Sequence, residues 1–168
     1  QSFSRFGAPG GPAVPLAAVS VSEVVSEVLA LYGGSASPVH FEQDVEPGLP
    51  AVVSRTTELK EVLVNLLENA RMAGEEGTRV QIVARRGPED TVLVSVVDDG
   101  SGIPEDVLPR IFEPQFSTRS TGTGLGLAIV QRLVRSWGAS VSVQSAVGQG
   151  TTVTVALRAW SEKEGATV

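Results

Sequence analysis

Apolar residues recur at helical spacing in three stretches of the chain. The clearest stretch begins at Thr56, which suits a first turn, and ends before Gly74, which suits a helix end. Its apolar stripe follows the spacing i, i+3, i+4, i+7, i+8 and i+11 and consists of Leu59, Val62, Leu63, Leu66, Leu67 and Ala70. The same pattern predicts a helix over residues 20–32 and another that follows a glycine-rich segment and ends at Trp137-Gly138.

Alternation of apolar and polar residues predicts six strands, over residues 39–45, 51–53, 79–86, 91–97, 140–145 and 151–157. Pro104 suits the first turn of a further short helix over 104–111. Residues 1–18 are rich in glycine and proline, which predicts a linker, and residues 159–168 are charged and small, which predicts a flexible tail. One domain is therefore expected over residues 19–158.

The composition is that of one globular domain, with 168 residues of which 42% are hydrophobic. A net charge of −6 disfavours nucleic acid and anionic membranes as partners, but it does not oppose ATP, because a bound magnesium ion and local dipoles offset it. The absence of cysteine excludes disulfides and thiolate metal sites, and no apolar run approaches the roughly 18 residues that cross a bilayer. The single histidine, His40, excludes catalysis by a histidine pair and is interpreted as an ordinary strand residue.

Two asparagines lie in the interior of the helix predicted over 56–73. Asn65 and Asn69 are four residues apart, so they stack on one flank of the apolar stripe. Because asparagine is a poor helix former, the pair calls for a reason. One interpretation is that the two side chains cap neighbouring loops; the other is that their carbonyl oxygens face a cleft and bind a hard cation such as Mg²⁺.

A carboxylate and two glycines follow the strand predicted over 91–97. Asp98 falls where this strand ends, and Gly100 and Gly102 follow it. A carboxylate at a strand end, backed by glycines that admit a flat ligand, can accept a hydrogen bond from an exocyclic amine. The alternative is that Asp98 and Asp99 merely form an Asx turn.

A second glycine-rich segment precedes the last helix, and it reads Gly122-Thr123-Gly124-Leu125-Gly126-Leu127. Glycine lets backbone N–H groups come close to an anion, and the positive end of the helix dipole points the same way. A flexible turn before a core helix is the alternative. The polar segment before it predicts either a surface loop or a lid, in which Phe112 and Phe116 are anchors and Arg119 is available for phosphate.

In this order the motifs resemble the catalytic, ATP-binding domain of bacterial two-component sensor histidine kinases, the HATPase_c or Bergerat-fold domain shared with gyrase, Hsp90 and MutL. The boxes that carry the resemblance are an N box at 65–70, a first glycine box at 98–102, an F box at 111–116, a second glycine box at 122–127 and a small last one at 148–151. The match covers residues 20 to 158. It implies an α+β fold, a two-layer α/β sandwich in which three helices cover a mixed, mostly antiparallel sheet.

The resemblance also implies ATP and Mg²⁺ as cofactors and gives the motif residues roles. Asn69 would hold Mg²⁺ on the triphosphate, with Asn65 supporting it or sharing the ion, and Glu68 is a candidate to orient the accepting histidine. Asp98 would bind the adenine amino group, helped by Thr151 through a water. The other nucleotide-binding residues that the resemblance implies are Gly100, Gly102, Ile103, Phe112, Phe116, Arg119, Gly122, Thr123, Gly124, Leu125, Gly126 and Leu127.

The function that the resemblance implies is donation of the γ-phosphoryl group of Mg-ATP to a histidine on dimerisation helices upstream of residue 1. The start Phe3-Ser4-Arg5-Phe6, with the proline-rich run after it, resembles the exit from those helices in the nitrogen-regulatory (NtrB- and NtrY-like) branch. We expect the helices and a response regulator as partners, a homodimeric parent and a monomeric fragment that lacks the phosphate-accepting histidine. We also expect a cytoplasmic location, with the membrane attachment of the parent left open.

The chain departs from the family pattern at a few positions. Met72 stands where many members place a phosphate-contacting lysine, and Ser101, Asp99 and Gln115 replace other frequent residues. Other functions stay open: a nucleotide-sensing or phosphatase-biased module, a serine kinase of the anti-sigma type, against which the linker at the start argues, and an ATP hydrolase of the gyrase or MutL type. Those hydrolases use a glutamate four residues before the metal-binding asparagine, where this chain has Asn65, which cannot act as a base.

Overall fold

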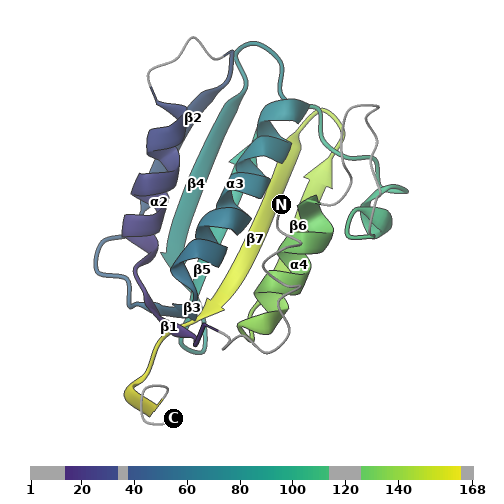
Figure 1. The fold of residues 1–168 in the computed structure, drawn as a ribbon. Helices are drawn as coiled ribbons and strands as arrows, with labels where there is room; N and C mark the ends of the chain where they lie inside the picture. Colours follow the sequence, from purple (N-terminus) through teal and green to yellow (C-terminus); the bar gives the residue numbers. More distant parts are fainter. Residues whose placement is uncertain (1–13, 34–37, 114–125, 164–168) are drawn as a thin grey trace.

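In the part of the chain that the structure describes, three α-helices cover one face of a five-stranded sheet (Figure 1). The structure is a computed structural model that describes residues 14–33, 38–113 and 126–163. The helices are α2 (Val21–Leu29), α3 (Thr56–Ala73) and α4 (Gly126–Ser136). The strands of the sheet are β2 (His40–Val45), β4 (Arg79–Arg86), β5 (Thr91–Asp98), β6 (Ser140–Ala146) and β7 (Gly150–Arg158).

The sheet is mixed and mostly antiparallel, in the strand order β2-β4-β5-β7-β6. Only the β2–β4 pair is parallel among these strands, with His40 opposite Arg79. The β4–β5, β5–β7 and β6–β7 pairs are antiparallel. The predicted two-layer sandwich is therefore confirmed, and its strands lie within one or two residues of the predicted ranges.

A small second sheet lies beside one end of the main one. It pairs β1 (Ala17–Val19) with β3 (Val52–Ser54) in antiparallel register. The sequence predicted no element before residue 20, because three residues are too few to show an alternating pattern. Beyond β7, Ala159 bridges to Val52 and the N–H of Trp160 donates to the carbonyl of Ala51 (2.7 Å), so the chain stays attached past Arg158.

The helix predicted over 104–111 is wrong. This segment forms turns and one short 3₁₀ helix, Leu108–Arg110. Its interior contains Pro109, which has no N–H to donate and whose ring would clash with the preceding helical turn. The first helix also stops earlier than predicted, because α2 gives way to a 3₁₀ turn at Ala30–Tyr32.

The core lies between the sheet and the helices, and α3 occupies its middle, between α2 and α4 (Figure 1). All six residues of the predicted apolar stripe of α3 are buried, which confirms the prediction. At the end of α4, the buried indole of Trp137 donates from Nε1 to the carboxylate of Glu58 on α3 (2.8 Å). Arg55 forms an ion pair with the same Glu58 oxygen. The carboxylate that accepts the buried indole N–H of Trp137 is therefore itself paired with a cation.

Substitution of Leu63 by alanine is expected to lower the free energy of unfolding by about 3 kcal/mol, because Leu63 is buried under the sheet and its removal leaves a cavity. Leu31→Ala serves as the control, because this leucine is 73% exposed and should change stability by less than about 0.5 kcal/mol. Urea unfolding of both variants makes the comparison. Equal losses would contradict the position of α3 at the centre of the core.

Candidate functional site

The predicted site residues of β5 lie at the end of the sheet where three elements meet, the upper end in Figure 1. A Cβ added to Gly100 would come within 3.2 Å of the carbonyl oxygen of Ala73, the last residue of α3. On the other side, the N–H of Gly148 in the β6–β7 turn donates to the carbonyl of Ser101 (2.9 Å). The loop after β5 is therefore held between the end of α3 and the β6–β7 hairpin.

Asp98 is buried, with 7% of its surface exposed, on the face of the sheet that the helices cover. Its Oδ1 accepts the N–H of Gly100 (2.9 Å), so the Asx turn considered as an alternative is present. The strand register places Thr151 directly opposite Asp98. The neighbouring Asp99 is exposed, and its Oδ1 accepts the N–H of Arg79 (2.8 Å), so the two acidic residues have separate roles.

Two glycines of this end are required by contacts within the chain. Gly102 has a φ of +78°, and a Cβ added there would overlap the backbone of Ala146 at the end of β6. Gly150 has a φ of +96°, and a Cβ added there would overlap the backbone of Asp98. Both lie in the left-handed region and in close contact with a neighbouring strand. The fold therefore needs both glycines whatever ligand the site takes.

Ser145 on β6 is a residue that sequence reasoning missed. Its Oγ accepts the N–H of Ile103 (2.7 Å), donates to the carbonyl of Gly150 (3.0 Å) and lies 2.8 Å from the Oγ1 of Thr151. It joins the loop after β5 to the β6–β7 hairpin. In the sequence it is one of several serines in a polar strand, and only the period-2 alternation of β6 places it on the helix-covered face.

The two asparagines of α3 are both half-buried. The side-chain Nδ2 of Asn65 donates to the backbone carbonyl of Glu61, one turn earlier (2.9 Å). This bond stays inside the helix, so it does not support the interpretation that Asn65 caps a loop. It fixes the amide nitrogen on the helix and leaves the amide oxygen as the group that Asn65 offers to a ligand.

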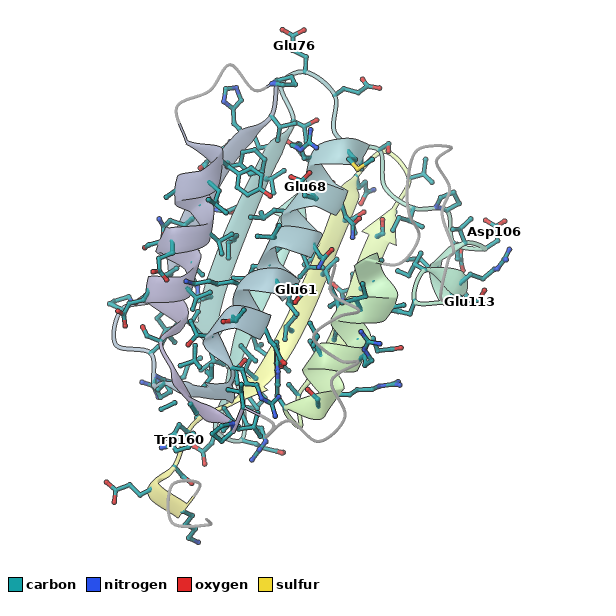
Figure 2. All side chains as sticks on the ribbon, in the orientation of Figure 1. Glu61, Glu68, Glu76, Asp106, Glu113 and Trp160 are labelled. Carbon is teal, nitrogen blue, oxygen red and sulfur yellow. The ribbon has the colours of Figure 1, made fainter. Side chains whose placement is uncertain are left out.

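Glu68, near the upper end of α3 in Figure 2, is bound by two donors. Arg71 forms an ion pair with it (2.7 Å), and the phenol of Tyr32 after α2 donates to its Oε2 (2.8 Å). The hydrogen bond from Arg71 lowers the pKa of Glu68, the bond from Tyr32 adds to this, and partial burial opposes it. Burial raises the pKa of the Tyr32 phenol, and its bond to Glu68 adds to the rise. Glu68 is therefore an ionised link between α2 and α3.

Of the other residues predicted to bind nucleotide, some lie within the described part of the chain and some outside it. Ile103, Phe112 and Leu127 are half-buried, and Gly126 begins α4. The other residues assigned to the lid and the phosphate end lie outside the described residues, and they are Phe116, Arg119, Gly122, Thr123, Gly124 and Leu125.

The described part of the chain contains no group of three histidine, cysteine or acidic residues that could hold a metal ion by themselves, and none of its helices is long and apolar enough to cross a membrane. A cavity of about 520 Å³ lies at the opposite end of the sheet, where Trp160 is labelled in Figure 2. Arg86, Asp90 and Arg158 also line it, so it is separate from the Asp98 end.

The family model described as histidine kinase-, DNA gyrase B- and HSP90-like ATPase matches residues 54–161, which is well over half of the chain. This chain belongs to that ATPase family. The match begins at the end of β3 and runs through α3, the Asp98 loop and the β6–β7 hairpin, so it includes every element that forms the site.

Sensor histidine kinases are among the relatives of this ATPase domain. The sensor histidine kinase ZraS of Klebsiella oxytoca is 37% identical over 135 residues, which cover 79% of this chain and 29% of ZraS. The nitrogen regulation protein NtrY of Azorhizobium caulinodans is 32% identical over an alignment of 172 positions, which covers 97% of this chain and 22% of NtrY. The chain therefore spans less than a third of the length of either relative.

Two solved structures share the fold of this domain. The catalytic domain of the histidine kinase ThkA aligns with a TM-score of 0.77 and 26% identity, over 87% of this chain and 97% of ThkA's. Full-length ShkA in complex with AMPPNP aligns with a TM-score of 0.77 and 29% identity, over 95% of this chain and 34% of ShkA. Both confirm that the fold is that of a histidine kinase catalytic domain.

Gly102→Ala is expected to lower the free energy of unfolding by about 2 kcal/mol more than Gly148→Ala. Both glycines have a positive φ, so both variants carry the backbone strain of the left-handed region. Only at Gly102 does the added Cβ meet another strand, because nothing lies within 4 Å of a Cβ at Gly148. Urea unfolding measures the difference, and similar losses would show that the contact with Ala146 is not tight.

Glu68→Gln is expected to lower the melting temperature at pH 7 and to lose this effect in acid. The pKa of Glu68 in the folded chain lies below its ordinary value, so its stabilisation is complete above the unfolded-state pKa of about 4.3. This stabilisation is lost as the pH falls through the lowered pKa of Glu68 in the folded chain. Exposed Glu76→Gln, on the loop after α3, is the control. If the difference in melting temperature between Glu68→Gln and the wild type stayed constant down to about pH 2, this would contradict the ionised link.

Proposed function

We propose that this chain binds ATP with Mg²⁺ at the Asp98 end of the sheet and presents the γ-phosphoryl group to a histidine on dimerisation helices of its parent protein. The observation that carries the proposal is a buried carboxylate, Asp98, at the end of a strand and on the face covered by α3. Two relatives support it, since ZraS is a sensor histidine kinase and ShkA has been solved in complex with AMPPNP.

The adenine end of the proposed site is formed by Asp98 and Thr151. An ionised carboxylate only accepts hydrogen bonds, and its two oxygens have lone pairs for several donors. The bond from the Gly100 N–H fixes the direction of the Asp98 carboxylate. A ligand amino group is the complementary partner. A Cβ at Gly100 would lie 3.0 Å from Oδ1 of Asp98, so a side chain at this position would crowd the carboxylate.

The magnesium end of the proposed site is assigned to Asn69 and Asn65. Without an acidic cluster among the described residues, the amide oxygens would share the ion with phosphate oxygens, which is the usual coordination of Mg²⁺ at a nucleotide. When bound, the ion neutralises charge on the transferring group. The bond from Asn65 to Glu61 orients the Asn65 amide for this role. We assign the phosphates themselves to residues 122–127 and Arg119.

Glu68 is better suited to anchoring than to orienting a histidine. Arg71 and Tyr32 already bind its carboxylate, and contact with an imidazole would have to replace one of these bonds. Asn69, the next residue, lies about 100° further around the helix. We therefore assign Asn69 to the reacting end of the site and Glu68 to the support of α3.

Of the alternative functions, the residues oppose the ATP hydrolase, whereas one observation favours the nucleotide-sensing module. An ATP hydrolase of the gyrase or MutL type needs a base at the position of Asn65, whose amide has no basic lone pair. A nucleotide-sensing module is favoured by one observation: Met72, 39% exposed near the end of α3, offers no charge to a phosphate.

The proposal further includes a parent of the nitrogen-regulatory branch, supported by the match to NtrY over nearly the whole chain, and a response regulator as its downstream partner.

Asp98→Asn is expected to weaken binding of ADP by about 10- to 100-fold in a calorimetric titration, because a hydrogen bond to a charged group contributes about 1.5–3 kcal/mol. Asparagine can still accept the N–H of Gly100, so the turn survives. Asp99→Asn is the matched control, since Asp99 is adjacent but exposed and should leave ADP binding unchanged.

Phosphoryl transfer is tested separately, by adding dimerisation helices of a close relative to the wild-type chain with labelled Mg-ATP. Label on the histidine supports the proposed kinase activity. ADP binding without any transfer would favour the nucleotide-sensing module. An absence of binding in the wild-type chain would overturn the proposal as a whole.

A further inference from the structure

Arg55 connects the start of α3 to the segment through which the chain enters the domain, at the end of the molecule where β1 and β3 lie in Figure 1. Its Nε donates to the backbone carbonyl of Val14, shortly before β1, and its Nη1 donates to Oε1 of Glu58 (3.1 Å). The pairing of β1 with β3 continues this attachment, because Ala17 lies opposite Ser54, the neighbour of Arg55. The entering segment is therefore held at the start of α3 by one side chain and one short strand pair.

The attachment also includes the end of α4. The Glu58 oxygen that accepts from Arg55 also accepts from Nε1 of the buried Trp137 (2.8 Å), so one carboxylate oxygen joins the two helices. α3 contains Asn69 and α4 begins at Gly126, and both residues are among those that we assign to the nucleotide site. The entering segment is thus fixed to the two helices that carry proposed site residues.

Arg55 is an unfavourable residue for the position that it occupies in α3. It is the N-cap, where serine, threonine, aspartate or asparagine would accept a backbone N–H, and its side chain makes no such bond. Its positive charge also lies at the positive end of the helix dipole. α2 shows the usual arrangement, since the Oγ of its N-cap Ser20 accepts the N–H of Glu23 (3.3 Å). A residue that breaks a local rule in this way is expected to have a role outside its own helix.

We propose that Arg55 is a positioning residue that fixes the direction in which the chain runs from this domain toward the dimerisation helices, and thereby places the bound nucleotide against the acceptor histidine. This inference rests on the proposed function, because it concerns delivery of the same γ-phosphoryl group. Asn69 lies about 21 Å further along the axis of α3, so Arg55 acts without touching the nucleotide.

The size of the expected effect separates positioning from simple tethering. Release of the few residues around Val14 lengthens a tether only slightly, and it changes the effective concentration of a tethered acceptor by less than about twofold. Loss of a fixed direction has a larger effect, because in-line phosphoryl transfer depends mainly on how the reacting groups are placed. Replacement of Arg55 is therefore expected to slow transfer to a tethered histidine by roughly five- to tenfold.

The test joins the dimerisation helices of a close relative to Gln1 of the 168-residue chain and follows label from Mg-ATP to the histidine. Arg55→Ser is expected to lower the maximal rate of this transfer roughly five- to tenfold, with the KM for ATP and the Kd for ADP unchanged. The new serine can accept the N–H of Glu58 as Ser20 accepts that of Glu23, so α3 gains a cap and the melting temperature should be retained. A residue with a merely structural role would not show lost activity with retained stability.

Two comparisons locate the effect in the tether. The same helices, added as a separate protein, should receive label from Arg55→Ser and from the wild-type chain at equal rates, because a separate acceptor does not depend on the entering segment. Arg85→Ala is the matched control, since this arginine also donates to a carboxylate and a backbone carbonyl, both of Asp44 on β2. It should leave tethered transfer unchanged. Amide exchange of β1 should accelerate several-fold in Arg55→Ser and not in Arg85→Ala.

The outcomes distinguish this inference from the function on which it rests. A wild-type chain that transfers label neither to tethered nor to separate helices overturns the proposed function and the inference with it. If the wild-type chain transfers label and Arg55→Ser transfers it equally well, or loses tethered and separate transfer alike, the inference alone is overturned. A fall confined to the tethered acceptor, with nucleotide affinity and stability retained, supports it.

Discussion

The burial of one face of α3 is the constraint on which the other features depend. Six apolar side chains of this helix pack against the sheet between α2 and α4, and their position fixes the rotation of the helix about its axis. With that rotation fixed, Glu68 meets Tyr32 on the side of α2, and Asn65 and Asn69 lie along another flank. The end of the helix, at Ala73, then meets the loop after β5.

The contact between the end of α3 and the loop after β5 brings distant parts of the sequence together at the candidate site. The loop after β5 is held by the end of α3 on one side and by the β6–β7 hairpin on the other, through backbone contacts that leave no room for side chains. Asp98 is thus fixed by its own strand, by the Gly100 N–H and by the backbone of Gly150. A carboxylate held from several directions keeps its orientation without a ligand, which lowers the ordering cost of binding.

The elements that the sequence predicted well are those whose signal is periodic. The stripe of α3 and the alternation of β4 and β5 each extend over eight residues or more, so the core and the order of the motifs could be recognised. β1 has three residues and exists because β3 pairs with it, which no local pattern reveals. The failed helix over 104–111 reflects Pro109, a local signal that outweighs the favourable start at Pro104. The role of Ser145 depends on the register of three strands, so only the structure displays it.

The glycines of the motifs show how fold and site overlap in this family of sequences. Glycine next to a candidate ligand residue suggests space for the ligand, yet Gly102 and Gly150 are required by the close approach of two pieces of backbone. Gly100 lies beside both the Asp98 carboxylate and α3, so a side chain there would crowd the carboxylate as well as the end of the helix. A substitution at Gly102 or Gly150 would therefore displace Asp98 through the fold, and a loss of binding there says little about contact with a ligand. The residues to which we assign the chemistry by their side chains, Asp98, Thr151 and Asn69, are the ones at which binding measurements test the proposed site itself.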